Sequence, residues 1–537
     1  MKLKSLLASA VVVAGATFLS LPAPSFAAEN VFRFANQSDL KSLDPYALSE
    51  TFSLAMIGSM YEGLVARDPD LKLVPALAES WDVSEDARIW TFHLRKGVTF
   101  QDGSPFTADD VIFSADRVRS SGSDLKSRVP ADAVFTKVDD HTVTVTTPEP
   151  SPLLNAVWDT WYIVSKSWAE AHDGKEVKVG GTAPSYMALN ANGTGPFKLV
   201  SHLPGVKTEW VPNPNWWGKP VHNLDQVVFT PISSGATRVA ALLSGEVDMI
   251  EPAPLQDVDR INNSGKATAL QGPEVRVIYL GFDQHSDVLP RSSLTKGNPF
   301  KDSRVKMAVY KAINEDAIIQ KVMRGAAVPA SLMVAKEMFP LADQFKRPAY
   351  DVDGAKALLT EAGYPDGFTV QLDCPNDRYV NDEKICQSIV PMLSKIGIKV
   401  NLNAEPKATY FSRIFASGGY DTSFYLLGWQ TNGSGSVGVL RDLFRCRDEK
   451  GNGGGNNVGN YCNPKVDALI EKISSEPNET KRNDMIAEAY RIGQEQEVAY
   501  VPLHQQTLAW GVAKNVKVVQ RADNDFRFYW VTKTAGQ

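Results

Sequence analysis

Apolar residues recur along this chain with two different spacings, and the balance between them changes near residue 285. In the first part, short alternating stretches predict strands, and fewer stretches have the three- and four-residue spacing of an amphipathic helix. The predicted strands are 30–35, 90–94, 227–229, 247–250 and 275–282, and the predicted helices are 50–64, one that begins after Thr107, and 237–243. This mixture indicates an α+β arrangement.

Helical spacing dominates after Pro299. The predicted helices are 303–314, 315–323, 351–362, 382–396 and 464–474, and the strands between them are 369–373, 399–403 and 423–427. Helices that alternate with single strands are typical of an α/β lobe. We therefore place a domain boundary near residue 285 and expect a protein that combines α/β and α+β parts.

The N-terminus has the pattern of an export signal. Lys2 and Lys4 precede an uncharged apolar run at residues 6–21, and small residues surround Ala27, where a signal peptidase would cleave. The run is shorter than the about 20 residues that a membrane-spanning helix needs. We expect residues 1–27 to be a signal peptide, with no cysteine nearby to carry a lipid anchor. In a bacterium with two membranes, the mature protein would be periplasmic.

The length and net charge of the chain limit the number of domains and the kinds of partner that we expect. The 537-residue chain is too long for a single hydrophobic core, because cores stop growing at about 250–300 residues. Two or three lobes are expected. The chain carries 62 acidic and 56 basic residues, a formal net charge of −6. Nucleic acids and anionic membranes require basic patches, so we expect neither as a partner.

All four cysteines lie in the second part of the chain. An exported protein can form disulfides. Cys446 and Cys462 flank the Gly/Asn-rich loop 451–459, which predicts a bond at the base of that loop, and Cys374 and Cys386 would join a strand end to a helix. The alternative, a Cys₄ zinc site, lacks the usual C-x₂-C pairs.

The sequence contains none of the common catalytic motifs. It has no G-x-S-x-G elbow, no H-E-x-x-H and no G-x-x-x-x-G-K-[ST], and its seven histidines are scattered. We therefore expect a protein that is not an enzyme and that holds no cofactor. A catalytic triad can be dispersed along a sequence, so a secreted hydrolase remains an alternative.

One long stretch resembles a known family. Residues 75–114 read P-A-L-A-E-S-W-D-V-S-E-D-A-R-I-W-T-F-H-L-R-K-G-V-T-F-Q-D-G-S-P-F-T-A-D-D-V-I-F-S. This segment closely resembles the signature of the periplasmic peptide-binding proteins of ABC importers. These are extracellular solute-binding proteins, and they include dipeptide-, oligopeptide-, glutathione- and nickel-binding members. Further matches follow in the family's order at 193–197, 215–218, 243–248, 300–305, 355–359 and 428–429. Most of these residues are aromatic core positions and turn glycines, so the signature identifies the fold rather than the solute.

The resemblance implies a periplasmic-binding-protein clamshell of two lobes with an extra inserted domain. The three domains would be a discontinuous domain I, an inserted domain II and an opposing domain III. Domain I would comprise 28–70, 194–283 and 508–537, domain II 71–193, and domain III 284–507. Ligand would lie between domains I and III, and the two segments that cross between them would act as a hinge.

The resemblance also suggests a ligand contact at Arg378. This residue aligns with an arginine by which dipeptide-binding relatives hold the peptide carboxylate, and Tyr379 and Asn381 share its segment. A guanidinium binds a carboxylate through two parallel hydrogen bonds. The alternative is a surface arginine that is paired with Asp377 or Asp382.

A second segment, 428–436, departs from the pattern of the peptide-binding relatives. In those relatives an aspartate receives the peptide's α-amino group, but the corresponding position here is Gly435, and no acid occurs between Asp421 and Asp442. Burial of an ammonium without a carboxylate costs several kcal/mol. Glu50 is the candidate substitute. The residues of the segment that we expect near the ligand are Trp429, Asn432, Ser434 and Gly435.

Together these features predict a monomeric receptor that captures a small solute and delivers it to an inner-membrane ABC permease. A short peptide or an amino-acid conjugate is the favoured ligand. Because Gly435 replaces the amine-binding acid, a non-peptide solute such as an opine, a sugar conjugate or a metal chelate is the alternative. A chaperone-like binder of unfolded peptide is a further possibility, beside the hydrolase.

Overall fold

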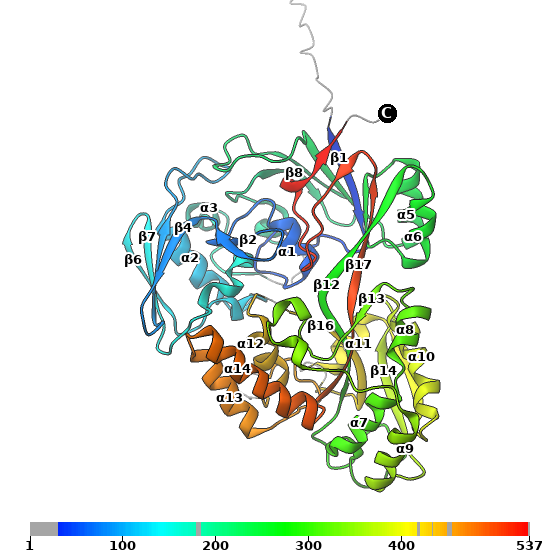
Figure 1. Ribbon diagram of the computed structural model, residues 1–537. Helices are drawn as coiled ribbons and strands as arrows, with labels where there is room; N and C mark the ends of the chain where they lie inside the picture. Colours follow the sequence, from blue (N-terminus) through cyan, green and yellow to red (C-terminus); the bar gives the residue numbers. More distant parts are fainter. Residues whose placement is uncertain (1–29, 179–183, 416–418, 432, 448–453, 535–537) are drawn as a thin grey trace, which may run out of the picture.

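The computed structural model shows an elongated molecule with two lobes that are joined by long strands (Figure 1). Residues 1–29 lie outside the part of the chain that the structure describes, and so does the predicted signal peptide. The described residues are 30–178, 184–415, 419–431, 433–447 and 454–534. Within these ranges, no helix has the length and apolar character that crossing a membrane requires.

One eleven-stranded sheet extends through both lobes. Its strands are β1 (Val31–Asn36), β8 (Phe197–Leu203), β9 (Lys207–Pro212), β10 (Gln226–Pro231), β11 (Met249–Glu251), β12 (Ala267–Phe282), β13 (Ala327–Pro329), β14 (Thr369–Pro375), β15 (Lys399–Glu405), β16 (Phe424–Gln430) and β17 (Tyr500–Ala513). They lie in the order β15-β14-β16-β12-β17-β11-β1-β10-β9-β8, and β13 pairs with β17. Parallel and antiparallel pairs are mixed: β1 is parallel to β10, and β12 is antiparallel to both β16 and β17.

The long strands β12 and β17 pass from one lobe to the other (Figure 1). Their pairing shifts register between Pro273 and Val277, so that residues 274–276 lie opposite the single residue Gln506. Such a β-bulge bends the strand and changes the direction of its side chains. The sequence predicted only the second half of β12 and did not predict β17, because residues of both faces of β17 are buried and no alternation marks it.

Residues 71–193 contain a separate four-stranded sheet. Its strands are β4 (Ala78–Val83), β5 (Ile89–Leu94), β7 (Thr142–Thr146) and β6 (Val134–Asp139), in that order, and near it lie β2 (Val65–Arg67), β3 (Leu73–Pro75), α2 (Ala108–Val118), α3 (Lys166–Ala171) and α4 (Tyr186–Leu189). Helix α2 begins after Thr107, as predicted, with a capping box formed by Thr107 and Asp110. One buried cluster joins Phe92 of β5 to Phe34 of β1. The division into three domains stays a prediction.

Helix α1 (Thr51–Ile57) is shorter than the helix predicted at 50–64. It ends at Gly58, where an added Cβ would lie 1.6 Å from the guanidinium of Arg527. Met60 and Tyr61 remain fully buried after the helix has ended. Their apolar spacing therefore reflected burial rather than helical structure.

The remaining helices surround the sheet. They are α5 (Gly235–Ser244), α6 (Val258–Asn262), α7 (Ser303–Ala312), α8 (Glu315–Lys321), α9 (Val352–Glu361), α10 (Asp382–Ser394), α11 (Lys407–Ile414), α12 (Gly435–Val439), α13 (Pro464–Ser475) and α14 (Glu479–Tyr490). In the lower lobe of Figure 1, α7, α9 and α10 lie on one side of the sheet, and α12, α13 and α14 form a group on the other side. This arrangement agrees with the α/β lobe predicted after residue 299.

Both predicted cysteine pairs are bonded. Cys374, in β14, bonds to Cys386, in α10, and Cys446 bonds to Cys462 across 16 residues. No cysteine remains free for a zinc site. The first bond closes a loop between a strand and a helix, and the second closes the Gly/Asn-rich loop.

Candidate functional site

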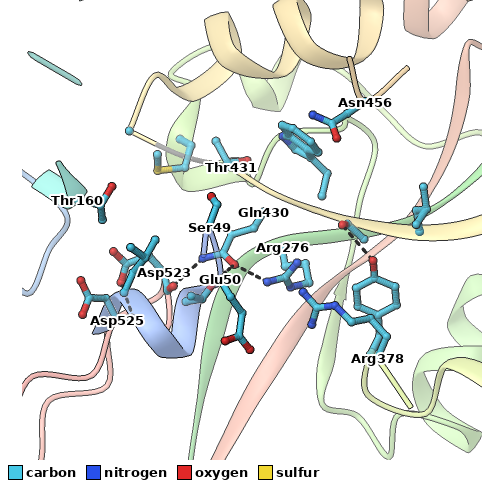
Figure 2. Close-up of a pocket in the computed structure, with 18 of the residues that line it drawn as sticks. Ser49, Glu50, Thr160, Arg276, Arg378, Gln430, Thr431, Asn456, Asp523 and Asp525 are labelled. Carbon is cyan, nitrogen blue, oxygen red and sulfur yellow. Dashed lines mark hydrogen bonds between the residues drawn. The ribbon is translucent and has the colours of Figure 1, made fainter. Parts of the chain in front are cut away.

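A cavity of about 470 Å³ lies between the two lobes, where segments that are far apart in the sequence meet (Figure 2). We call it the inter-lobe cavity. Its wall includes Glu50, Arg67, Arg128, Asp159, Thr160, Arg276, Arg378, Tyr379, Trp429, Gln430, Thr431, Asn456, Asp523 and Asp525. The sequence placed the ligand between domains I and III alone. Three of these residues, Arg128, Asp159 and Thr160, come from the segment 71–193.

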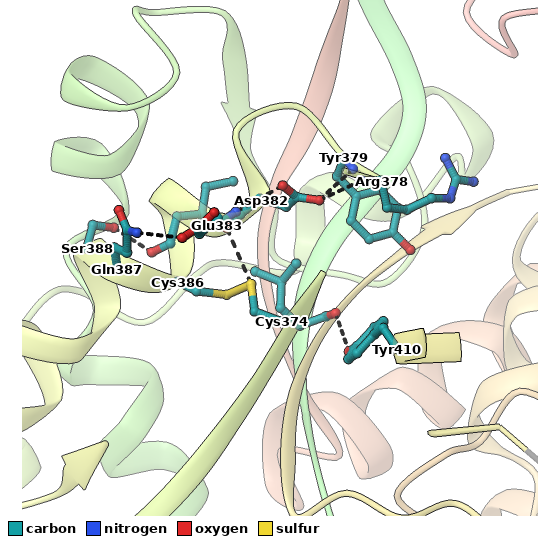
Figure 3. Close-up of a disulfide and its surroundings, with 11 residues drawn as sticks. Cys374, Arg378, Tyr379, Asp382, Glu383, Cys386, Gln387, Ser388 and Tyr410 are labelled. Atoms are coloured by element: carbon teal, nitrogen blue, oxygen red, sulfur yellow. Dashed lines mark hydrogen bonds between the residues drawn. A yellow bond between two sulfur atoms is a disulfide. The ribbon is translucent and has the colours of Figure 1, made fainter. Parts of the chain in front are cut away.

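The loop that carries Arg378 is held firmly at its base (Figure 3). Asp382 accepts hydrogen bonds from the backbone N–H groups of Arg378 and Tyr379, both at 2.9 Å. The Cys374–Cys386 disulfide joins the strand before this loop to the helix after it. The backbone of the loop is therefore restrained at both ends, and Arg378 lies on the cavity wall.

The guanidinium of Arg378 has no acidic partner among the described residues. Asp382, which the sequence offered as a partner, instead binds backbone N–H groups. The guanidinium lies 5.1 Å from the ring centroid of Tyr379, within the range of a cation–π contact. Burial, and after it the neighbouring charge of Arg276, lowers the pKa of Arg378. Arginine remains charged in proteins, so this half-buried cation is available to an anion.

A second arginine on the wall, Arg276, is paired within the protein. The bulge in β12 places Glu274 and Arg276 together, and Arg276 Nε donates to Glu274 at 3.0 Å. Arg276 also donates to Gln430. Gln506, opposite the bulge, donates to the other oxygen of Glu274 at 2.6 Å. Sequence reasoning missed this network, although two charged residues in an otherwise apolar strand were a signal that could have revealed it.

Two acids lie across the cavity from Arg378 in Figure 2, on the segment that follows β17. Asp523 is paired with Arg521, and Asp525 accepts a hydrogen bond from Arg527 at 2.6 Å. Burial raises the pKa of Asp523, and the charge of Arg521 opposes that rise. The sequence did not identify these acids, because they lie outside the motifs that carry the resemblance.

Several buried polar atoms on the wall lack a hydrogen-bond partner among the described residues. They are Thr160 Oγ1, Trp429 Nε1, Thr431 Oγ1 and Asp525 Oδ1. Buried polar atoms in proteins are nearly always hydrogen-bonded, to protein or to ordered water. These atoms have almost no accessible surface, so a molecule in the cavity would reach them only after a local side-chain movement.

The second predicted segment contributes less than expected. Trp429 lines the cavity, Asn432 lies outside the described residues, and Ser434 and Gly435 are not among the lining residues. Gly435 has φ +56° at the start of α12, a conformation in which a side chain is strained. An acid at this position would therefore conflict with the local backbone.

The other predicted residues divide between two cavities. Glu50 precedes α1, lines the inter-lobe cavity and accepts a hydrogen bond from Ser53 at 2.8 Å. Glu50, Arg378 and Tyr379 also line an adjoining cavity of about 350 Å³. Asn381 lines only the adjoining cavity, and its side chain donates to the carbonyl of Val322 at 2.9 Å. It therefore supports the loop of Arg378.

The residues of the inter-lobe cavity can bind charge and form hydrogen bonds. Its described lining contains neither histidine nor cysteine. Across the described ranges, no cluster of three or more histidine, cysteine, aspartate or glutamate side chains is suited to hold a metal ion.

Comparison with known proteins identifies the family. The model of the bacterial extracellular solute-binding proteins, family 5 (middle region), matches residues 72–451. The chain belongs to this family. This solute-binding protein is 29% identical to the dipeptide-binding protein of Escherichia coli K12 over 477 residues, which are 83% of each chain. It is 27% identical to the glutathione-binding protein GsiB of Pectobacterium atrosepticum over 487 residues, 89% of each chain.

A solved structure supports the fold of the solute-binding protein. The periplasmic binding protein AgaA of A. tumefaciens R10, in complex with agropinic acid, has a TM-score of 0.76 and 24% identity, covering 94% of this chain and 99% of AgaA. The fold predicted from the sequence, a two-lobe α/β solute-binding protein, is thereby confirmed.

Proposed function

We propose that this protein is the periplasmic receptor of an ABC importer. It captures a small solute in the inter-lobe cavity and delivers it to an inner-membrane permease, and residues 1–27 direct its export. A short peptide or an amino-acid conjugate is the favoured ligand class, and the relatives named for a dipeptide and for glutathione support it. The protein itself catalyses no reaction in this proposal.

The observation that carries this proposal is the guanidinium of Arg378, which lies unpaired at a cavity between the lobes. A charge that is removed from water without a partner is costly. An anionic group on the solute would pair with this guanidinium.

A second candidate is a solute without an α-amino group, such as an opine, a sugar conjugate or a metal chelate. This candidate is favoured by Gly435, which stands where peptide-binding relatives have an aspartate and whose positive φ disfavours any side chain. Under the first candidate, Glu50 supplies the counter-charge for an amine. The presence or absence of an amine on the natural solute separates the two.

Mass spectrometry of the solute that is released on denaturation of protein purified from the periplasm tests both candidates. The receptor proposal predicts an intact small molecule, whereas a hydrolase would convert a labelled peptide pool to products.

Added back to the protein at a hundredfold excess over Kd, the solute should stabilise the fold by about 2.7 kcal/mol. Small-angle scattering should then show a smaller radius of gyration if the lobes close on the solute. An unchanged radius with bound solute would contradict the clamshell.

A further inference from the structure

Most charged side chains on the wall of the inter-lobe cavity are already paired within the protein. Arg276 is paired with Glu274, as described above. Arg67 lies 3.2 Å from Asp159 and donates to two backbone carbonyls, both at 2.6 Å. The acids of the segment after β17 are paired with arginines of the same segment. These groups have little capacity left for a solute charge.

Two arginines on the wall are exceptions. One is Arg378. The other is Arg128, which ends the short 3₁₀ helix Lys126–Arg128 and whose carbonyl accepts a hydrogen bond from Trp158 Nε1 at 2.8 Å. That bond fixes the backbone beneath Arg128. Its guanidinium forms no hydrogen bond or ion pair with any residue that the structure describes.

The two arginines share a second property, because both side chains are half-buried. Burial lowers the pKa of Arg128 and of Arg378. An arginine side chain is not deprotonated in a protein, so each of the two guanidiniums keeps its charge. An anion is needed to offset the hydration that each has lost. Within the described residues, no acid of the wall forms an ion pair with either guanidinium, and Asp159, the acid that acts most strongly on Arg128, is already paired with Arg67. An anion of the solute would therefore complete the pairing of both arginines.

The two arginines have different charged neighbours on the wall. Among these, Asp159 acts most strongly on Arg128, whereas Arg276 acts most strongly on Arg378. Thr160, which follows Asp159 in the chain, lies across the cavity from Arg378 in Figure 2. Each guanidinium can bind one carboxylate through two parallel hydrogen bonds.

We infer that the solute carries two separated acid groups, one bound by Arg378 and the other by Arg128. This inference rests on the proposed receptor function and narrows its ligand class. Glu50 is the one acid on the wall whose only hydrogen bond comes from a hydroxyl, that of Ser53, within the described residues. Glu50 is therefore the acid of this wall that we assign to an ammonium group of the solute. A diacid with a single amine, such as a glutamyl or aspartyl conjugate, matches this set of charges.

The test compares each acid group with its neutral amide. The released solute is identified by mass spectrometry, and a version with a carboxamide at each acid group is prepared. For protein purified empty, thermal-shift screening uses dipeptides that contain glutamate or aspartate, together with their glutamine or asparagine counterparts. Calorimetry then measures Kd for the wild type, Arg128→Gln, Arg378→Gln and the control Lys126→Gln. Lys126 lies on the same short helix and is exposed.

Each arginine variant should weaken binding of the diacid by roughly 30-fold or more. Arg128→Gln should also abolish the preference for acid over amide at one group, and Arg378→Gln should abolish it at the other. Lys126→Gln should bind as the wild type does. A bound solute with a single acid group, or wild-type affinity in Arg128→Gln, would overturn the inference and leave the receptor function standing. A protein that binds no small solute of any kind would instead overturn the receptor function.

Discussion

The inter-lobe cavity and a second cavity, of about 390 Å³, are similar in size but differ in how their polar groups are used. The second cavity, which we call the Glu62 cavity, lies beside Trp216 and Trp217. Glu62 accepts hydrogen bonds from the indoles of Trp216 at 3.1 Å and Trp217 at 2.9 Å, and from Thr194 at 2.8 Å. Its carboxylate is thus satisfied by the protein. In the inter-lobe cavity, the guanidinium of Arg378 has no such partner among the described residues, and this difference rather than volume favours that cavity as the proposed solute site.

The sharpest test of this contrast removes the guanidinium of Arg378. Loss of a charge-assisted contact to a buried carboxylate costs about 2–5 kcal/mol, roughly a 30- to 5,000-fold change in Kd. Arg378→Ala should therefore nearly abolish binding of the natural solute and leave the unfolding transition in place. Calorimetry with the solute measures the first effect and thermal unfolding the second. Normal binding by the variant would make Arg378 a surface charge only.

A second test loosens one wall of the inter-lobe cavity and leaves the Glu62 cavity intact. The Cys446–Cys462 disulfide closes the loop that carries Asn456, a lining residue. Replacement of both cysteines by serine should lower the free energy of unfolding by about 3 kcal/mol on the chain-entropy model. Denaturant unfolding measures this loss, and calorimetry shows whether the solute also binds more weakly. Two alkylatable thiols at these positions in native periplasmic protein would contradict the bond.

The reverse experiment targets the Glu62 cavity. Glu62→Ala would leave the indoles of Trp216 and Trp217 and the hydroxyl of Thr194 without their acceptor. A buried donor that loses its partner costs about 1–3 kcal/mol, so stability should fall while solute affinity stays unchanged. A variant with wild-type stability and weakened binding would reverse the roles that we assign to the two cavities.

The pH dependence of stability provides a check on the same residue. Burial raises the pKa of Glu62 above its ordinary value. The folded protein therefore holds this proton more tightly than the unfolded chain does, and stability should decrease as the pH rises from the ordinary pKa through the raised one. Glu62→Gln cannot ionise and should lack this decrease. Denaturant unfolding of both proteins across the acidic range measures the difference.

The smallest effect is expected at Glu50. This carboxylate is half-buried and solvent-screened, so an ion pair with a solute amine should contribute about 1 kcal/mol or less. Glu50→Gln should weaken binding of solutes with a free amine and spare their N-acetylated forms. Equal effects on both, measured by calorimetry, would leave Glu50 with only its structural role before α1.

The sequence predicted those features that depend on local residue patterns or on motifs shared with the family. Arg378 was predicted because it follows a predicted strand in a segment that resembles peptide-binding relatives, and the structure places it on the cavity wall. Both disulfides were predicted from the positions of their cysteines, around a loop and between a strand and a helix. Arg276 was not predicted, because the bulge that places it beside Glu274 depends on pairing with a strand more than 200 residues away. Arg128 was missed because it lies in the predicted domain II, whereas the ligand was expected between domains I and III. Long-range pairing and the meeting of distant loops decide these positions, and neither leaves a local pattern.

The bulge in β12 also constrains how this protein can change over evolutionary time. Side chains alternate between the two faces of a strand, so a deletion of one residue among 274–276 would turn every later residue of β12 to the opposite face. Buried residues such as Ile278 and Leu280 would then exchange places with Val277 and Tyr279. Point substitutions at Glu274 or Arg276 keep the register, but replacing only one of the two leaves the buried charge of the other without its partner. We therefore expect changes here to replace both residues together and to preserve the length of the segment.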